Sequence, residues 1–239
     1  YGVPLRVSAT MVFLFVLLGA LLEKSGGGRW FVQLAFSLLG RYRGGPGKAA
    51  VLASGLTGMI SGSSIANVVT TGTFTIPLMI KVGLPAYKAA AVEVAASTNG
   101  QLMPPIMGAA TFLMAEFLEM PYAAIMVAAL LPAALYYIAV FIQVDLFAAR
   151  DQIAIVTDDL PKLGSVLAAG WHFSLPFIVL LYALFGLNEE PPLAALYASL
   201  TIAVAGLVRS YNGQGLKLRD LVDAFWETGI TCVELILIV

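Results

Sequence analysis

Two polar motifs interrupt long apolar stretches of this sequence, and their residue types suit the binding of a small cation and an organic anion. The first motif is GMISGSSIAN at 58–67, and the second is AASTNGQLMPP at 95–105. Both combine small residues with hydroxyl and amide side chains, and the second ends in two prolines that interrupt a helical hydrogen-bond ladder. A helix that stops inside a membrane offers carbonyl oxygens to a cation, and one that starts there offers N–H groups to a carboxylate. The sequence therefore predicts one shared site built from two broken helices.

The ion expected at this site is Na⁺, because hard cations prefer oxygen ligands and no acidic cluster or thiolate accompanies the motifs. Backbone carbonyls are expected to supply most of the ligands. The side chains expected to assist them are Ser61, Ser63, Ser64, Ser97 and Asn99. The residues expected to contact the solute are Ser64, Asn67, Thr71, Thr98, Asn99, Gln101 and Pro104. Na⁺ is expected as a coupling ion, and no cofactor is expected.

Glu93 lies one helical turn before Ser97, within an otherwise apolar stretch. An isolated carboxylate inside a membrane costs at least about 2.5 kcal/mol, so an acidic residue there is a functional-site hypothesis by default. Two interpretations stay open for Glu93. Glu93 either binds a proton or stabilises the second break through contacts with neighbouring residues.

The same small residues have a simpler interpretation, in which they only let helices approach closely, as in the GxxxG spacing of Gly58 and Gly62. Two such motifs in neighbouring apolar elements favour the binding site over packing alone. An enzyme is not expected, because the apolar stretches contain no His-Glu zinc motif, no paired aspartates and no Ser-His arrangement.

The elements that position these motifs are membrane helices. Of the 239 residues, 60% are hydrophobic and only 11% are charged, and the mean hydropathy is +0.91. A bilayer core takes about 20 apolar residues per helix. The plain spans predicted from the sequence are 5–22, 121–147, 171–187, 191–208 and 221–239. Residues 29–39 are predicted to form an amphipathic surface helix, and the broken elements extend over 49–80 and 86–118. The expected fold class is an all-α polytopic membrane protein.

The distribution of basic residues favours a re-entrant hairpin, meaning that residues 46–81 enter and leave the membrane on one side. With that topology the connectors at 23–48, 81–88, 150–162 and 209–219 share a face and hold twelve of the thirteen Lys and Arg residues. Basic connectors remain in the cytoplasm. We therefore expect the hairpin base and these connectors to be cytoplasmic, with the second element crossing as a discontinuous helix.

The two motifs in their wider context resemble the large membrane subunit of TRAP (tripartite ATP-independent periplasmic) transporters. The segments that carry the resemblance are SGLTGMISGSSIANVVTTGTFTIPLM at 54–79 and EVAASTNGQLMPPIMGAATFLMAEF at 93–117. The chain looks most similar to the TAXI branch, in which the small and large membrane subunits are often fused. The resemblance implies a permease in the bacterial inner membrane that imports an organic acid with Na⁺ by an elevator mechanism. It also implies a periplasmic solute-binding protein and a small membrane subunit, or its fused equivalent, as partners.

The family fold contains a second, inverted copy of the hairpin and broken helix, and this sequence shows only one. We therefore expect a partial chain, half of an inverted-repeat transporter, whose remaining C-terminal half is a further partner. The expected divisions are a scaffold-type span with the amphipathic helix at 1–45, the transport-domain hairpin and broken helix at 46–120, connecting spans at 121–220, and the start of a second repeat at 221–239. The lipid bilayer surrounds these elements, and no nucleic acid is expected to bind.

Two other functions stay open. One is a dicarboxylate/Na⁺ symporter that takes its solute without a binding protein. The other is a channel or a structural membrane subunit, although a channel needs a continuous polar path and the polar residues here are concentrated in two breaks.

Overall fold

The structure, a computed structural model, describes residues 2–153, 160–211, 213 and 215–238. The described residues form helices and no β-strand, which confirms the predicted all-α class. Among these described residues, four helical segments are long and apolar enough to cross a membrane by length and composition: Leu5–Lys24, Tyr122–Arg150, Leu163–Gly186 and Pro191–Val208. The predicted spans at 5–22, 121–147, 171–187 and 191–208 overlap them. The re-entrant course of the hairpin and the cytoplasmic side of the basic connectors stay predictions.

The chain forms two compact units, each described by itself. We call Gly28–Met103 with Ala129–Ala169 the hairpin unit, and Tyr1–Gly27, Pro104–Ala128 and Gly170–Val239 the terminal unit. The expected division of function among 1–45, 46–120, 121–220 and 221–239 stays a prediction.

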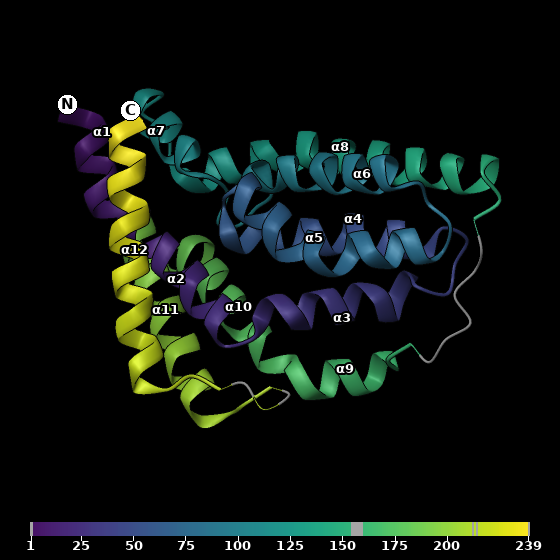
Figure 1. Cartoon of the computed structure of the whole chain (residues 1–239). Coiled ribbons are helices and arrows are strands. Elements are labelled where there is room, and N and C mark those ends of the chain that lie inside the picture. Colours follow the sequence, from purple (N-terminus) through teal and green to yellow (C-terminus); the bar gives the residue numbers. More distant parts are fainter. Residues whose placement is uncertain (1, 154–159, 212, 214, 239) are drawn as a thin grey trace. The chain divides into compact units, whose positions relative to one another are not determined.

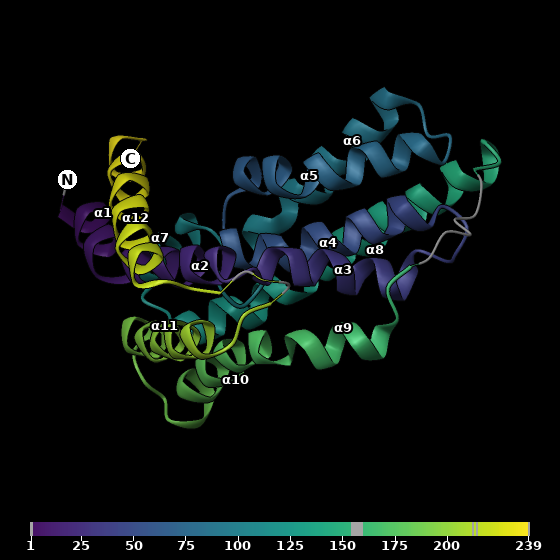
Figure 2. The same ribbon diagram turned by 60° about the horizontal axis from the view of Figure 1, so that its bottom comes forward.

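The hairpin unit contains both polar motifs. Its helices are α3 (Gly27–Leu39), α4 (Gly45–Ser61), α5 (Ser64–Lys81), α6 (Ala86–Thr98), most of α8 (Tyr122–Arg150) and α9 (Leu163–Gly170), with a 3₁₀ turn at Asn99–Leu102. Helix α5 packs against both α4 and α6, and α4 also packs against α6 (Figure 1, Figure 2). The polar residues of the two motifs therefore belong to one three-helix group.

The first break is a tight turn between α4 and α5. Gly62 has φ of 59°, a left-handed conformation that glycine adopts without steric strain, and its N–H donates to the carbonyl of Gly58. Ser63 is the N-cap of α5, because its hydroxyl accepts from the N–H of Ala66. A C-cap and an N-cap in consecutive residues reverse the chain, so that α4 and α5 form a helical hairpin.

The second break follows α6. The helix ends at Thr98, and the 3₁₀ turn carries the chain to Leu102. The next helix, α7, begins at Ala109, and the peptide bond between Pro104 and Pro105 is cis. Pro104 and Pro105 lack the N–H groups that an α-helical ladder needs, so the chain does not return to α-helix directly after the 3₁₀ turn.

Ion pairs join helix α8, and the residue directly after it, to the N-terminal ends of α4 and α6. Asp145 accepts from Lys48 at 2.6 Å and from Arg43 at 2.7 Å, at the start of α4. Asp151, directly after α8, pairs with Lys88 at the start of α6 and with Arg150. Buried Met79, Val92 and Val144 of α5, α6 and α8 belong to one hydrophobic core. This core consists of Ala50, Val51, Met79, Leu84, Ala89, Val92, Ala96, Val144, Ala148 and Ile153.

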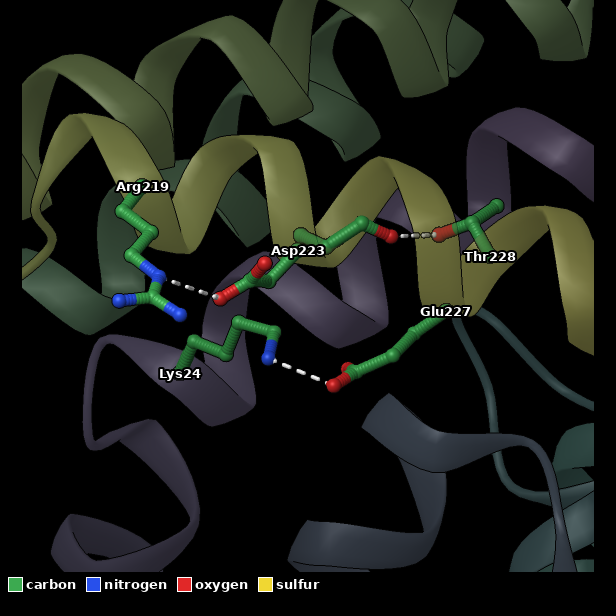
Figure 3. A network of polar contacts seen from close by, with 6 residues as sticks. Lys24, Arg219, Asp223, Glu227 and Thr228 are labelled. Atoms are coloured by element: carbon green, nitrogen blue, oxygen red, sulfur yellow. Dashed lines mark hydrogen bonds and ion pairs between the residues drawn. The ribbon is translucent and has the colours of Figure 1, made fainter.

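The terminal unit is a separate helical group. Its elements are α1 (Gly2–Val7), a π-helical turn (Ser8–Val12), α2 (Phe13–Lys24), α7 (Ala109–Phe117), a 3₁₀ turn (Trp171–Ser174), α10 (Leu175–Leu181), a π-helical turn (Tyr182–Gly186), α11 (Pro191–Val208) and α12 (Leu218–Ile238). Lys24 of α2 pairs with Glu227 of α12 at 2.8 Å. Within α12, Nε of Arg219 lies 3.9 Å from Oδ2 of Asp223, one helical turn further on (Figure 3). The Lys24–Glu227 pair joins α12 to α2, whereas the Arg219–Asp223 pair lies within α12.

Candidate functional site

The polar centre of the hairpin unit is the carboxyl group of Glu93, whose side chain is fully buried. Glu93 Oε1 accepts hydrogen bonds from Ser54 at 2.9 Å, from Ser97 at 3.1 Å and from Thr71. Glu93 Oε2 accepts from Thr75. The four hydroxyls come from α4, α5 and α6, so that one carboxyl group joins all three helices. We call these five residues the Glu93 cluster.

Helical spacing explains why these side chains converge. Thr71 and Thr75 are four residues apart on α5, and Glu93 and Ser97 are four residues apart on α6, so each pair lies on one face of its helix. Gly72 leaves room for the acidic side chain, because a Cβ there would lie 3.2 Å from Glu93 Cγ. The two faces therefore meet without an intervening side chain.

Asn67 is a second buried connection inside the hairpin. Its amide Nδ2 donates to the carbonyl of Ser54 at 2.8 Å, and its Oδ1 accepts from the hydroxyl of Thr57 at 2.6 Å. The carbonyl of Asn67 also accepts from the hydroxyl of Thr71 at 2.7 Å. Asn67 thus fixes the register of α5 against α4 and contacts Ser54 and Thr71 of the Glu93 cluster.

The two breaks meet at a pair of glycines. A Cβ placed on Gly58 would lie 2.5 Å from the Cα of Gly100, and one on Gly100 would lie 2.8 Å from the Cα of Gly58. Both distances are far below van der Waals contact, so only glycine allows the 3₁₀ turn to lie against α4. The close-packing interpretation therefore holds for Gly58, while Gly62 serves the turn itself.

The hairpin turn carries the remaining hydroxyls of the predicted ion site. Ser64 Oγ accepts a hydrogen bond from Gln101 Nε2 at 2.8 Å, which connects the turn to the second break. Ser61 Oγ donates to the carbonyl of Ser63 at 3.3 Å. The turn is thus a second polar group, separate from the Glu93 cluster in its hydrogen bonds.

Three predicted site residues have other surroundings. Asn99 is buried and donates through Nδ2 to the carbonyl of Ala133 on α8 at 3.1 Å. Thr98 is exposed, and its hydroxyl donates to the carbonyl of Val94. Pro104 belongs to the terminal unit. The roles predicted for these residues stay predictions, as do those of the other predicted site residues.

Sequence reasoning did not single out Ser54, Thr57 or Thr75, which bind Glu93 or Asn67. A signal was present, because Ser54 and Thr57 lie in an apolar helix before the first motif and Thr75 follows Thr71 by four residues. Buried hydroxyls at such spacing indicate a polar partner on a neighbouring helix. That partner was not identifiable without the packing of α4 against α5 and α6.

No basic side chain pairs with Glu93 in the described part of the chain. Its hydrogen-bond partners there are all hydroxyls. The described residues also hold no group of three or more His, Cys, Asp or Glu side chains able to bind a metal ion. The chemistry available is therefore that of one carboxyl group with hydroxyl, amide and carbonyl oxygens.

Comparison with protein families gives the wider context of this geometry. The family described as "Tripartite ATP-independent periplasmic transporter, DctM component" matches residues 3–239. The chain belongs to this family. The resemblance to the large TRAP membrane subunit is thereby confirmed, whereas the TAXI branch, a fusion with the small subunit and a partial chain stay predictions. Membership in a membrane transporter family agrees with the apolar helices and supports a multi-pass protein of the inner membrane.

Several relatives share the DctM sequence pattern. YgiK of Salmonella typhimurium is 29% identical over 216 residues, which cover 87% of this chain and 47% of YgiK. The C4-dicarboxylate TRAP transporter large permease protein DctM of Pseudomonas aeruginosa is 38% identical over 91 residues, covering 38% of this chain and 21% of that protein. The isethionate TRAP transporter permease protein DctMQ of Oleidesulfovibrio alaskensis is 34% identical over 91 residues, covering 38% and 14%. This chain spans about half or less of the length of these three relatives.

Proposed function

We propose that this DctM-family chain is part of a permease that imports an organic acid across the bacterial inner membrane, driven by Na⁺. The observation that carries the proposal is the contact of Gly58, in the last turns of α4 before the first break, with Gly100 of the second break, in a protein whose described residues include four helical segments apolar enough to cross a membrane. Unwound backbone in a membrane is tolerated where it lines a binding cavity or is buried in protein. The names of two relatives mention C4-dicarboxylate and isethionate, which are both organic anions.

Within this proposal the hairpin turn and the second break hold the solute and Na⁺. Ser64 and Gln101 already contact each other there, so solute binding replaces or extends that contact. The three hairpin-unit helices move together, because the Glu93 cluster and Asn67 connect them by buried hydrogen bonds. A periplasmic solute-binding protein delivers the solute, and a small membrane subunit or its fused equivalent completes the permease.

The test is uptake of labelled C4-dicarboxylate and of isethionate by cells that express the whole permease with its partner proteins. Replacing Na⁺ by choline at constant ionic strength should abolish uptake of the transported anion. Osmotic shock, which removes periplasmic proteins, should abolish it as well. Uptake that survives shock would favour the symporter without a binding protein, and uptake that persists in choline would contradict Na⁺ coupling.

A matched pair of variants connects this test to the site. Ser64→Ala removes a hydroxyl at the contact of the two breaks and should raise the KM for the solute or for Na⁺ by about tenfold. Thr201→Ala removes an exposed hydroxyl on α11 that only donates to the carbonyl of Tyr197, and it should leave both KM values unchanged. Equal KM values in both variants would remove Ser64 from the site.

A further inference from the structure

Glu93 presents a problem of charge balance. Its carboxyl group is fully buried among three helices, and no basic side chain pairs with it in the part of the chain that the structure describes. An ionised carboxylate in a low-dielectric interior costs several kcal/mol unless a positive charge accompanies it. Neutral hydroxyls reduce this cost and do not supply the missing charge.

Two pairs of hydroxyl oxygens beside Glu93 Oε1 are spaced as neighbouring ligands of one ion would be. Ser54 Oγ lies 3.3 Å from Thr71 Oγ1 and 3.5 Å from Ser97 Oγ. Hard cations such as Ca²⁺ have metal–oxygen distances of about 2.3–2.6 Å, which put neighbouring ligands of an octahedron about 3.3–3.7 Å apart. Ser54 Oγ thus has ligand-like spacing from both other hydroxyls. Glu93 Oε1, which accepts hydrogen bonds from Ser54 at 2.9 Å and from Ser97 at 3.1 Å, would have to move away from these hydroxyls to ligate the same ion.

The threonine hydroxyls do not depend on Glu93 as an acceptor. Thr71 Oγ1 lies 2.7 Å from the carbonyl of Asn67, and Thr75 Oγ1 lies 3.0 Å from the carbonyl of Thr71. Each hydroxyl has one proton, which it can donate to the carbonyl four residues earlier while a lone pair faces a cation. The two threonine hydroxyls thus keep an acceptor for their protons with or without a bound ion.

We propose that the Glu93 cluster is a site for one monovalent hard cation, Na⁺, ligated by Glu93 Oε1 and the hydroxyl oxygens of Ser54, Thr71 and Ser97. One carboxylate carries one negative charge, which a monovalent ion neutralises and a divalent ion would overcompensate. The site connects α4, α5 and α6, and is separate in its hydrogen bonds from the hairpin turn. This inference rests on the proposed function, because Na⁺ bound here would hold the hairpin and the broken helix together as one rigid body.

The experiment is thermal unfolding of the purified whole permease in NaCl and in choline chloride at equal ionic strength. A ligand that binds the folded state raises the unfolding midpoint with its concentration. The wild type should show this rise, and Glu93→Gln should lower the apparent Na⁺ affinity by about a hundredfold because the balancing charge is lost. Glu116→Gln, a carboxylate of the terminal unit near Arg6, is the matched control and should behave as the wild type.

A second pair of variants keeps the test valid if Glu93→Gln does not fold. Thr71→Val removes one proposed ligand with little change of shape and should weaken the Na⁺ response by about tenfold. Thr73→Val removes an exposed hydroxyl from the same helix, one that donates only to the carbonyl of Thr70, and should leave the response unchanged.

The outcomes separate this inference from the proposed function. A wild type without a Na⁺ response, or a response unchanged in both Glu93→Gln and Thr71→Val, would overturn the cation site, whatever uptake shows. A midpoint that follows pH and ignores Na⁺ would assign a proton to Glu93 and overturn it as well. If the Na⁺ response is lost in these variants while uptake by the wild type needs no Na⁺, the site stands and the proposed coupling fails.

Discussion

Gly58 of α4 and Gly100 of the 3₁₀ turn lie so close that a methyl group on Gly58 would be 2.5 Å from the backbone of Gly100. The contact joins residues that are far apart in the sequence and belong to the two different helix breaks. Because the obstacle is backbone on both sides, a side chain cannot be accommodated by a change of rotamer.

Gly58→Ala should therefore destabilise the protein by about 1–3 kcal/mol, the usual cost of overpacking. Gly28→Ala on α3 is the matched control, because a Cβ there would meet nothing within 4 Å. That change should stabilise by about 0.4–1 kcal/mol through the entropy of the unfolded chain. Thermal unfolding midpoints of the two variants in the same detergent would check both signs, and equal midpoints would contradict the close approach.

Asn67 and Thr57 should be energetically coupled, since the hydroxyl of Thr57 donates to Oδ1 of Asn67 at 2.6 Å inside the hairpin. Asn67→Ala, Thr57→Val and the double variant form a double-mutant cycle. A coupling energy of about 0.5–3 kcal/mol is expected from unfolding free energies. Strict additivity would mean that the hydrogen bond does not fix the register of α5 against α4.

Asp151 should make stability depend on pH in the acid range. Hydrogen bonds from Lys88, and then from Arg150, hold the pKa of the Asp151 carboxyl below its ordinary value of 3.8. A group with a lowered pKa in the folded state stabilises that state above its ordinary pKa, and this contribution is lost as pH falls through the folded pKa. The unfolding midpoint should thus decrease below about pH 4 in the wild type.

Asp151→Asn should show a shallower decrease over the same pH range, because this carboxyl no longer takes up a proton. Lys88→Gln should also reduce the slope, since it removes the principal partner, whereas Lys162→Gln replaces an exposed lysine and should not. Identical pH profiles for Asp151→Asn and the wild type would rule out this ion pair as a source of acid sensitivity.

Gln101 should affect transport more than stability, because its amide is exposed and binds Ser64 across the two breaks. Gln101→Ala should raise the KM of uptake by about tenfold and shift the unfolding midpoint little. Thr201→Ala, which removes a hydroxyl of α11 that donates to the carbonyl of Tyr197, is the control. A large loss of stability with an unchanged KM would instead give Gln101 a structural role.

Proline alone did not determine where the helices break. Pro77 lies inside α5 and Pro132 inside α8, and both helices continue through them. The break after Thr98 coincides instead with Asn-Gly followed by two consecutive prolines, and that after Ser61 coincides with Gly62 and the capping Ser63. The combination of turn and capping residues, which is visible in the sequence, therefore indicated where the two helices break.

The sequence by itself determined the membrane-protein class, the helical fold and the positions of both breaks, because hydropathy, caps and turn residues act over short distances along the chain. Only the tertiary structure decided that Glu93 meets Ser54, Thr71 and Thr75, and that Asn99 binds the carbonyl of Ala133. These contacts depend on the angle and register at which separate helices pack. A rotation of α6 by one residue would direct Glu93 elsewhere without changing any local pattern.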